Sequence, residues 1–327
     1  MTSPWLSVPL ILFGLVPASG SAQAPQAPTV SALEREISSA STFGKMGPLT
    51  SEIDRALAAK DYERAERLLA DAIAREPTSR QLLTRIAGVF LMDRKPLNAA
   101  IALKKAEALG PLDHHARLQL ALAYIAMKRG DWARPELERL AAAEPANVIH
   151  RYWLARLDYD NGQYVSAIRR LREVVAEAPA FARAHDNLGL CYDALHQPDE
   201  AIPHYREAVR LNRLDKEAAS AWPALNLGIL LRTRGDLEEA EALFREAVTH
   251  DGDFAPGHYQ LGAVLEQRGR MDEAVKSLRR ATSTDATYAE AYYALSRIYR
   301  RQGRAAEADA AMSTFKRLHD ARREAPR

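Results

Sequence analysis

The chain has 327 residues, of which 47% are hydrophobic and 27% are charged. This apolar share is too high for a disordered chain and is sufficient for a sizeable core. Its 45 basic and 43 acidic residues leave a net charge of +2, so charge predicts attraction neither to nucleic acid nor to an anionic membrane. The single cysteine, Cys191, excludes an internal disulfide, a cysteine-based zinc site and an iron–sulfur cluster.

The N-terminus carries an apolar run, Leu6 to Val16, followed by small residues from Ala18 to Ala22. The run is too short for a membrane-spanning helix, which needs roughly 20 apolar residues, but it suits the core of a secretory signal. We therefore expect a signal peptide over residues 1–22, cleaved after Ala22, and a periplasmic or secreted protein without an integral membrane span. Cleavage after Gly20 and an unprocessed apolar tail are the alternatives.

The signal departs from the usual pattern because no Lys or Arg precedes Arg35. Residues 23–45 follow as a linker, with room for a short helix. Its first part, Gln23 to Val30, contains two prolines and little that can be buried, which favours an extended segment.

A 34-residue period occupies the rest of the chain. Four prolines, Pro77, Pro111, Pro145 and Pro179, keep this spacing, and so do Gly235, Gly269 and Gly303. Alanines keep the same register, except for a five-residue slip in the fifth unit, at positions 65, 99, 133, 167, 201, 240, 274 and 308. The period divides the chain into eight units with a polar tail at 323–327. The units are 46–79, 80–113, 114–147, 148–181, 182–220, 221–254, 255–288 and 289–322.

Inside each unit, large residues at positions 4, 7 and 11 form one stripe of a first helix, and positions 20, 24 and 27 form the matching stripe of a second. Small residues at positions 8 and 20 allow the helices to approach closely. Gly near position 15 permits the turn, and Pro at position 32 ends the second helix. The first unit is the weakest, because Glu52 stands at position 7 and Ala56 at position 11.

These residues resemble the tetratricopeptide repeat family, whose pattern includes Leu-Gly at positions 7–8, Tyr at 11, Ala at 20, a large residue at 24 and Pro at 32. The matching residues at positions 7–8, 11 and 24 are Leu188-Gly189, Leu227-Gly228, Leu261-Gly262, Tyr124, Tyr192, Tyr299, Tyr205 and Phe244. The resemblance implies an all-α fold, a right-handed superhelix (solenoid) of about eight helix-turn-helix repeats. Because five extra residues lie near Leu214 to Ser220, we expect the stacking to change there and to divide the superhelix into two halves.

No known catalytic motif is present: the chain lacks Gly-x-Ser-x-Gly, a phosphate-binding glycine loop and His-Glu-x-x-His. The adjacent His114 and His115 cannot share a helical face as metal ligands. His185 and His258 stand at position 4 and Cys191 at position 10, where packing is the favoured interpretation. We therefore expect no enzymatic activity, no cofactor and no metal site.

The resemblance places the functional surface in the concave groove, lined by positions 2, 5, 6, 9, 12 and 13 of the first helices. Aromatic and amide side chains there suit an extended peptide, because rings offer area at low entropic cost and amides pair with peptide groups. The predicted groove residues are Tyr152, Trp153, Arg156, Tyr159, Asp186, Asn187, Leu190, Asp193, Asn226, Ile229, Tyr259, Gln260, Tyr293 and Arg297.

Position 6 carries Asn187, Asn226 and Gln260 in successive units, similar to the asparagine ladder by which some family members hold a peptide main chain. The alternative is that Asn at position 6 only supports the fold. The carboxylate clamp of the co-chaperone members is not supported, because no Asn stands at position 9. Four arginines, Arg297, Arg300, Arg301 and Arg304, are either a site for an acidic C-terminus or phosphate, or a solvated terminal face.

The sequence thus predicts a non-enzymatic scaffold that binds a protein or an extended peptide segment in the groove. The alternative is an accessory subunit of a cell-envelope enzyme, of polysaccharide export or of secretion machinery, which rests on analogy.

Overall fold

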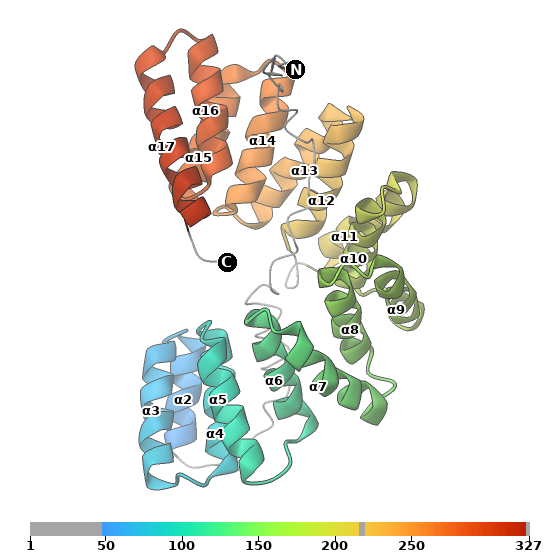
Figure 1. The fold of residues 1–327 in the computed structure, drawn as a ribbon, viewed down its shortest axis with the longest axis vertical. Helices are drawn as coiled ribbons and strands as arrows, with labels where there is room; N and C mark the ends of the chain where they lie inside the picture. The colour runs from blue at the N-terminus through green and yellow to red at the C-terminus, as the bar shows by residue number, and fades with distance from the viewer. Residues whose placement is uncertain (1–47, 216–219, 325–327) are drawn as a thin grey trace, which may run out of the picture.

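The computed structural model describes residues 48–215 and 220–324, which form sixteen α-helices and no β-strand. Figure 1 shows the helices in sequence around an open arc. They are α2 (Pro48–Ala58), α3 (Tyr62–Arg75), α4 (Arg80–Met92), α5 (Pro96–Ala108), α6 (His114–Ala126), α7 (Gly130–Ala143), α8 (Val148–Asp160), α9 (Tyr164–Glu177), α10 (Ala182–Ala194), α11 (Pro198–Leu214), α12 (Trp222–Arg234), α13 (Leu237–His250), α14 (Ala255–Gln267), α15 (Met271–Thr284), α16 (Ala289–Arg301) and α17 (Ala305–Glu324). The all-α solenoid fold is confirmed.

Each unit expected from the sequence contains one pair of helices, from α2 and α3 in the first to α16 and α17 in the last. The first unit, which had the weakest pattern, also forms a pair, with Ile53 and Ala56 buried in its first helix. The predicted signal peptide and linker, residues 1–22 and 23–45, lie outside the described residues. Among the helices that the structure describes, none has both the length and the hydrophobicity to cross a bilayer.

The turn inside each pair uses one left-handed residue at position 15. Glycine supplies it at Gly162, Gly235, Gly269 and Gly303. The other four turns use Lys60, Arg94, Lys128 and His196, with φ between 55° and 58°. The same backbone therefore recurs in all eight units, although only half of them have the residue type that adopts it without steric cost.

The two helices of a pair meet where position 24 packs on position 8. A Cβ added at Gly189 would lie 2.5 Å from the ring of Tyr205, and one added at Gly228 would lie 2.6 Å from the ring of Phe244. Both rings are fully buried. Glycine is thus required at these positions by the close approach of an aromatic side chain from the partner helix.

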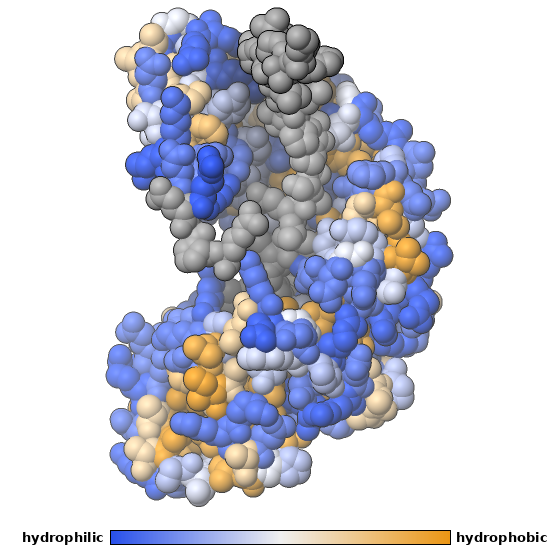
Figure 2. Space-filling view, viewed as in Figure 1, coloured by the Kyte–Doolittle hydropathy of each residue, from blue (hydrophilic) through white to orange (hydrophobic). Residues whose placement is uncertain are grey.

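The arc has an inner side formed by the first helices of the units. Successive first helices, such as α10, α12, α14 and α16, contact one another across unit boundaries, whereas the second helices make no comparable contacts among themselves. Helices on the inside of a curved stack are closer together, so the first helices line its concave side. Figure 2 shows the hollowed side of the arc and a largely hydrophilic outer surface, with an apolar patch over α5.

The five-residue insertion is partly absorbed by α11, which has 17 residues where most second helices have 14. Asn212, near the end of α11, forms two hydrogen bonds with Ser220. Its Nδ2 donates to the carbonyl of Ser220 at 2.9 Å, and its Oδ1 accepts from the Ser220 N–H at 2.7 Å. The buried Asn212 amide thus satisfies both backbone groups of Ser220, where the next unit begins.

The apolar core continues across this insertion, so the two halves expected there share one core, and the change in stacking angle stays a prediction. One cluster of buried residues runs from Ala121 to Ala311 and includes Val209 in α11 and Ala224 in α12. A second cluster runs from Ile53 to Ala123, and the two meet on α6. The insertion lengthens α11, and the apolar positions on both sides of it still belong to one cluster.

Candidate functional site

The candidate site is the inner face, which we define as the fourteen predicted groove residues on α8, α10, α12, α14 and α16. Seven of them are buried: Tyr152, Trp153, Arg156, Asp186, Asn187, Leu190 and Asn226. Five are partly buried: Tyr159, Asp193, Ile229, Tyr259 and Gln260. Tyr293 and Arg297 are exposed. Accessible side chains are thus concentrated toward the C-terminal units, and the partner-binding role of all fourteen stays a prediction.

In the middle of the inner face, polar side chains bond to one another across unit boundaries. The Nδ2 of Asn187 donates to the hydroxyl of Tyr152 at 3.3 Å and to the carbonyl of Arg183 at 2.8 Å. The Nδ2 of Asn226 donates to both carboxylate oxygens of Asp186, at 3.0 and 3.2 Å. In both cases an Asn at position 6 donates to position 5 of the preceding unit.

These hydrogen bonds reduce the number of asparagine side-chain atoms that an asparagine ladder offers to a partner. The amide donors of Asn187 and Asn226 are engaged within the chain, whereas the Oδ1 of Asn187 and the Oε1 of Gln260 are buried without a hydrogen-bond partner among the described residues. Both oxygens are shielded from solvent, so a peptide lying on the inner face does not reach them as the side chains stand. The bonds made by Asn187 and Asn226 within the chain favour a role in the fold, and peptide binding by this ladder stays a prediction.

Asp186 has an unusual environment for a carboxylate. It is buried between α10 and α12, and desolvation raises its pKa to about 6, although the hydrogen bond from Asn226 and the charge of Arg156 act in the opposite direction. Arg156 in turn donates to Asp160 at 3.3 Å. The centre of the inner face thus holds a carboxyl group that gains or loses a proton near neutral pH.

Tyrosine rings on the inner face pack against neighbouring aromatic rings. Tyr259 lies 5.3 Å from Tyr288, and Tyr293 lies 5.2 Å from Phe315, measured between ring centroids. Each contact stabilises its tyrosine by a favourable ring–ring interaction.

Charged residues dominate the C-terminal end of the inner face. Glu266 on α14 has a nearly buried side chain and accepts from Arg297 at 3.0 Å and from Arg301 at 3.2 Å. Because two guanidinium groups share one carboxylate, this end has an excess of positive charge.

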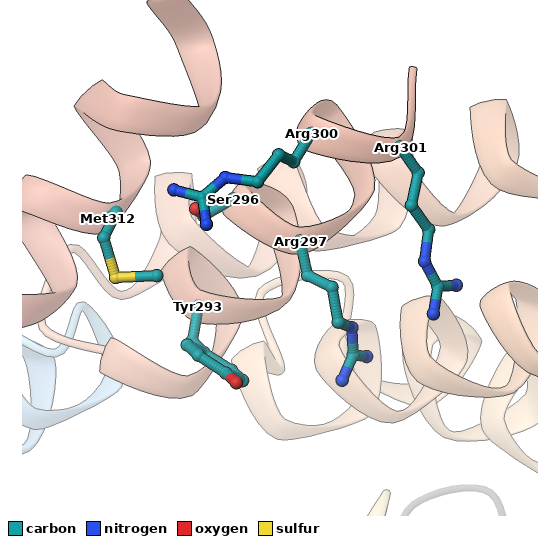
Figure 3. Close-up of a pocket in the computed structure, with 6 residues that line it drawn as sticks. All are labelled: Tyr293, Ser296, Arg297, Arg300, Arg301 and Met312. Carbon is teal, nitrogen blue, oxygen red and sulfur yellow. The ribbon is translucent and has the colours of Figure 1, made fainter. Parts of the chain in front are cut away.

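A cavity of about 310 Å³ opens between α16 and α17, as Figure 3 shows. It is lined by Tyr293, Ser296, Arg297, Arg300, Arg301 and Met312. Sequence reasoning included the tyrosine and the arginines but missed Ser296 and Met312. The two residues stand at positions 8 and 24 of the last unit. Units five and six have Gly and an aromatic residue at these positions, and this difference is the sequence feature that marks the cavity.

The two position-4 histidines and Cys191 make contacts within the chain. The Nε2 of His185 lies 3.1 Å from the carbonyl of Pro179, and the Nε2 of His258 lies 2.9 Å from the carbonyl of Gly252, so both position-4 histidines bond to the preceding unit. Cys191 is buried, and desolvation raises its pKa to about 12, which disfavours the reactive thiolate. Among residues 48–215 and 220–324, no group of three metal-binding side chains is present.

Comparison with protein families finds tetratricopeptide repeat models that match residues 50–114, 118–168, 180–251, 225–288 and 259–320, which together cover more than half of the chain. No curated protein matches the sequence.

Solved structures with a similar fold include the complex of Cut9 and Hcn1 from the APC/C, with a TM-score of 0.64 and 15% identity over 83% of this chain and 54% of that one. A tetratricopeptide repeat protein from Parabacteroides merdae has a TM-score of 0.59 and 16% identity over 72% of this chain and 92% of that one. PilW, described as a type IV pilus biogenesis factor, has a TM-score of 0.55 and 18% identity over 62% and 92%. At these identities the likeness concerns the fold alone.

Proposed function

Because this chain belongs to the tetratricopeptide repeat family, we propose that it is a non-enzymatic scaffold whose inner face holds a segment of another protein. Family members bind proteins or peptides and are generally not enzymes. We place the binding surface on the inner face because its aromatic and polar side chains on α14 and α16 are exposed or partly buried.

The observation that carries the proposal is the contrast between the two parts of the inner face. Around Tyr152 and Asn187 the polar side chains are buried and bond to each other, whereas Tyr259 and Gln260 are partly buried and Tyr293 is exposed. An extended segment that crosses α14 and α16 meets tyrosine rings that offer contact area for its side chains.

Site-specific photo-crosslinking tests this proposal. A photoreactive phenylalanine analogue is placed at Tyr259 or at Tyr293 in the full chain, and at Val165, an exposed residue of the second helix α9, as the control. We expect a discrete adduct from Tyr259 and Tyr293 and none from Val165. Equal labelling at all three positions, or no adduct at any of them, contradicts binding on the inner face.

We also propose that the protein is exported, on the basis of the apolar run from Leu6 to Val16 and the small residues up to Ala22. The test is the mass and N-terminal sequence of the protein recovered from the cell envelope or medium. A chain that begins at Gln23 or Ser21 supports export, and an intact Met1 in the cytoplasmic fraction contradicts it.

A further inference from the structure

The cavity between α16 and α17 has the composition of an anion site. Figure 3 shows three arginines from α16 around it, with Arg300 directed toward Ser296 and Met312 and with Arg297 and Arg301 extending to the other side. Its volume of about 310 Å³ lies at the lower end of the range of small-ligand pockets.

The charges around the cavity do not balance. Arg297 and Arg301 share Glu266, while the carboxylate nearest to Arg300 is that of Asp309, at 3.6 Å between two exposed side chains. An exposed pair at this distance contributes little and leaves the guanidinium free to take another partner. Three positive groups thus face two negative ones, which leaves one positive charge to be neutralised.

Ser296 supplies a second, independent indication. Its side chain is 1% exposed, lines the cavity and has a hydroxyl with no hydrogen-bond partner among the described residues. A buried hydroxyl without a partner is costly, and a carboxylate oxygen is a strong acceptor for it. Tyr293 and Met312 complete the wall with apolar atoms, which suit the methylene groups of an acidic side chain.

We propose that this cavity, the α16–α17 pocket, binds a carboxylate of an acidic peptide segment that extends from the inner face. Arg300 pairs with the carboxylate, the Ser296 hydroxyl donates to it, and Tyr293 and Met312 contact its stem. One carboxylate matches the single unbalanced positive charge. This inference rests on the proposed scaffold function and adds the chemistry of the partner.

Fluorescence anisotropy with the full chain tests the pocket. The probe is a short fluorescein-labelled peptide of alternating Glu and Ala residues with an amidated C-terminus, compared with the same peptide carrying Gln in place of Glu. We expect the Glu peptide to bind and the Gln peptide to bind at least about tenfold more weakly. A Gln peptide with a free C-terminus distinguishes a terminal carboxylate from a side-chain carboxylate.

Variants then locate the binding. Arg300→Ala and Ser296→Ala should each weaken the Glu peptide by about tenfold, whereas Arg317→Ala, an exposed arginine on α17 outside the pocket, should change it less than about twofold. Unfolding followed by circular dichroism should show that both pocket variants remain folded. A similar loss in all three variants indicates general charge attraction and overturns the proposal. Displacement of the peptide by inorganic phosphate without any dependence on Ser296 and Arg300 also overturns it.

The result separates this inference from the scaffold function. If the Glu peptide does not bind while Tyr259 still yields its crosslinked adduct, the pocket proposal alone is wrong. If the adduct is also absent, the scaffold function on the inner face is wrong.

Discussion

At the scale of single residues, the free energy of unfolding depends on the protonation of Asp186 on the inner face. Its carboxyl is buried against Asn226, and desolvation raises its pKa to about 6 from an ordinary value of 3.8. Between these two pH values the folded chain holds a proton that the unfolded chain has released. Raising the pH through this window therefore lowers stability, and above pH 6 the full cost is present.

We predict that Asp186→Asn removes this pH dependence. The new amide oxygen can still accept from Asn226, so the variant should gain about 3 kcal/mol relative to the natural chain between pH 4 and pH 7. Denaturant unfolding at a series of pH values measures the difference, with Asp236→Asn as the control, because Asp236 is an exposed N-cap residue of α13 whose side chain makes no capping hydrogen bond. Parallel pH profiles for the natural chain and Asp186→Asn contradict the prediction.

A second residue-level prediction concerns the left-handed turns. His196 is exposed and has φ 58°, a conformation that costs a residue with a Cβ about 1–2 kcal/mol. His196→Gly removes this cost but adds about 0.4–1 kcal/mol of unfolded-state entropy, so a net gain of about 0.5–1 kcal/mol is expected. Thermal unfolding measures it. Gln197→Gly, at the next residue with negative φ, should instead lose stability, and equal effects of both substitutions refute the argument.

At the level of the helix pair, the contact between positions 8 and 24 sets how closely two helices approach. Gly189 faces Tyr205, and the whole ring of Tyr205 is enclosed. Glycine inside a helix lowers stability by about 1 kcal/mol relative to alanine, so propensity alone favours a substitution here. At this position the steric clash with Tyr205 disfavours alanine, whereas helix propensity favours it.

We predict that the clash outweighs the gain in helix propensity. Gly189→Ala should destabilise the chain by about 1–3 kcal/mol, because three ring atoms of Tyr205 lie within 2.8 Å of the added Cβ. The measurement is denaturant unfolding. Gly252→Ala is the control, since nothing lies within 4 Å of its added Cβ and its effect should stay within about 0.5 kcal/mol. A Gly189→Ala chain as stable as the natural one contradicts the contact.

For the whole molecule, the two core clusters that meet on α6 indicate that a substitution changes the stability of nearby units more than that of distant ones. Each unit packs mainly on its neighbours, so a defect in one unit should be felt nearby and not at the far end of the arc. Leu103 in α5 and Leu278 in α15 offer a matched comparison, because both occupy position 24 and both are fully buried.

We predict that Leu103→Ala speeds hydrogen exchange in α4 and α5 by about 100-fold or more and leaves α14 and α15 unchanged. Leu278→Ala should do the reverse. Exchange followed by mass spectrometry measures both variants. An equal increase along the whole chain in either variant indicates a single cooperative unit and refutes this prediction.

Much of the fold was predictable because it depends on short-range pattern. The period of Ala65 and its equivalents located the helix pairs, and the small residues at position 8 anticipated the close contact at Gly189. The continuity of the core across the insertion was not predicted. Sequence spacing shows that five residues are added, but only packing shows that Val209 and Ala224 still belong to one cluster.

The candidate site was predictable only in outline. Position numbers placed Asn187 and Asn226 on first helices, but nothing in the pattern showed that their donors are occupied by Tyr152 and Asp186. The pocket at Ser296 and Met312 was likewise missed, because each residue is ordinary by itself and only their combination leaves space.

The amino-acid sequence by itself determined the helices, their turns and their pairing, since these depend on residues fewer than about 34 apart and on backbone preferences that act locally. Tertiary structure decided which polar groups are satisfied within the chain. Asn226 meets Asp186 across 40 residues, and Arg297 meets Glu266 across 31. Such pairs form only when units stack at a particular angle and distance, and that geometry results from the packing of all side chains between the units.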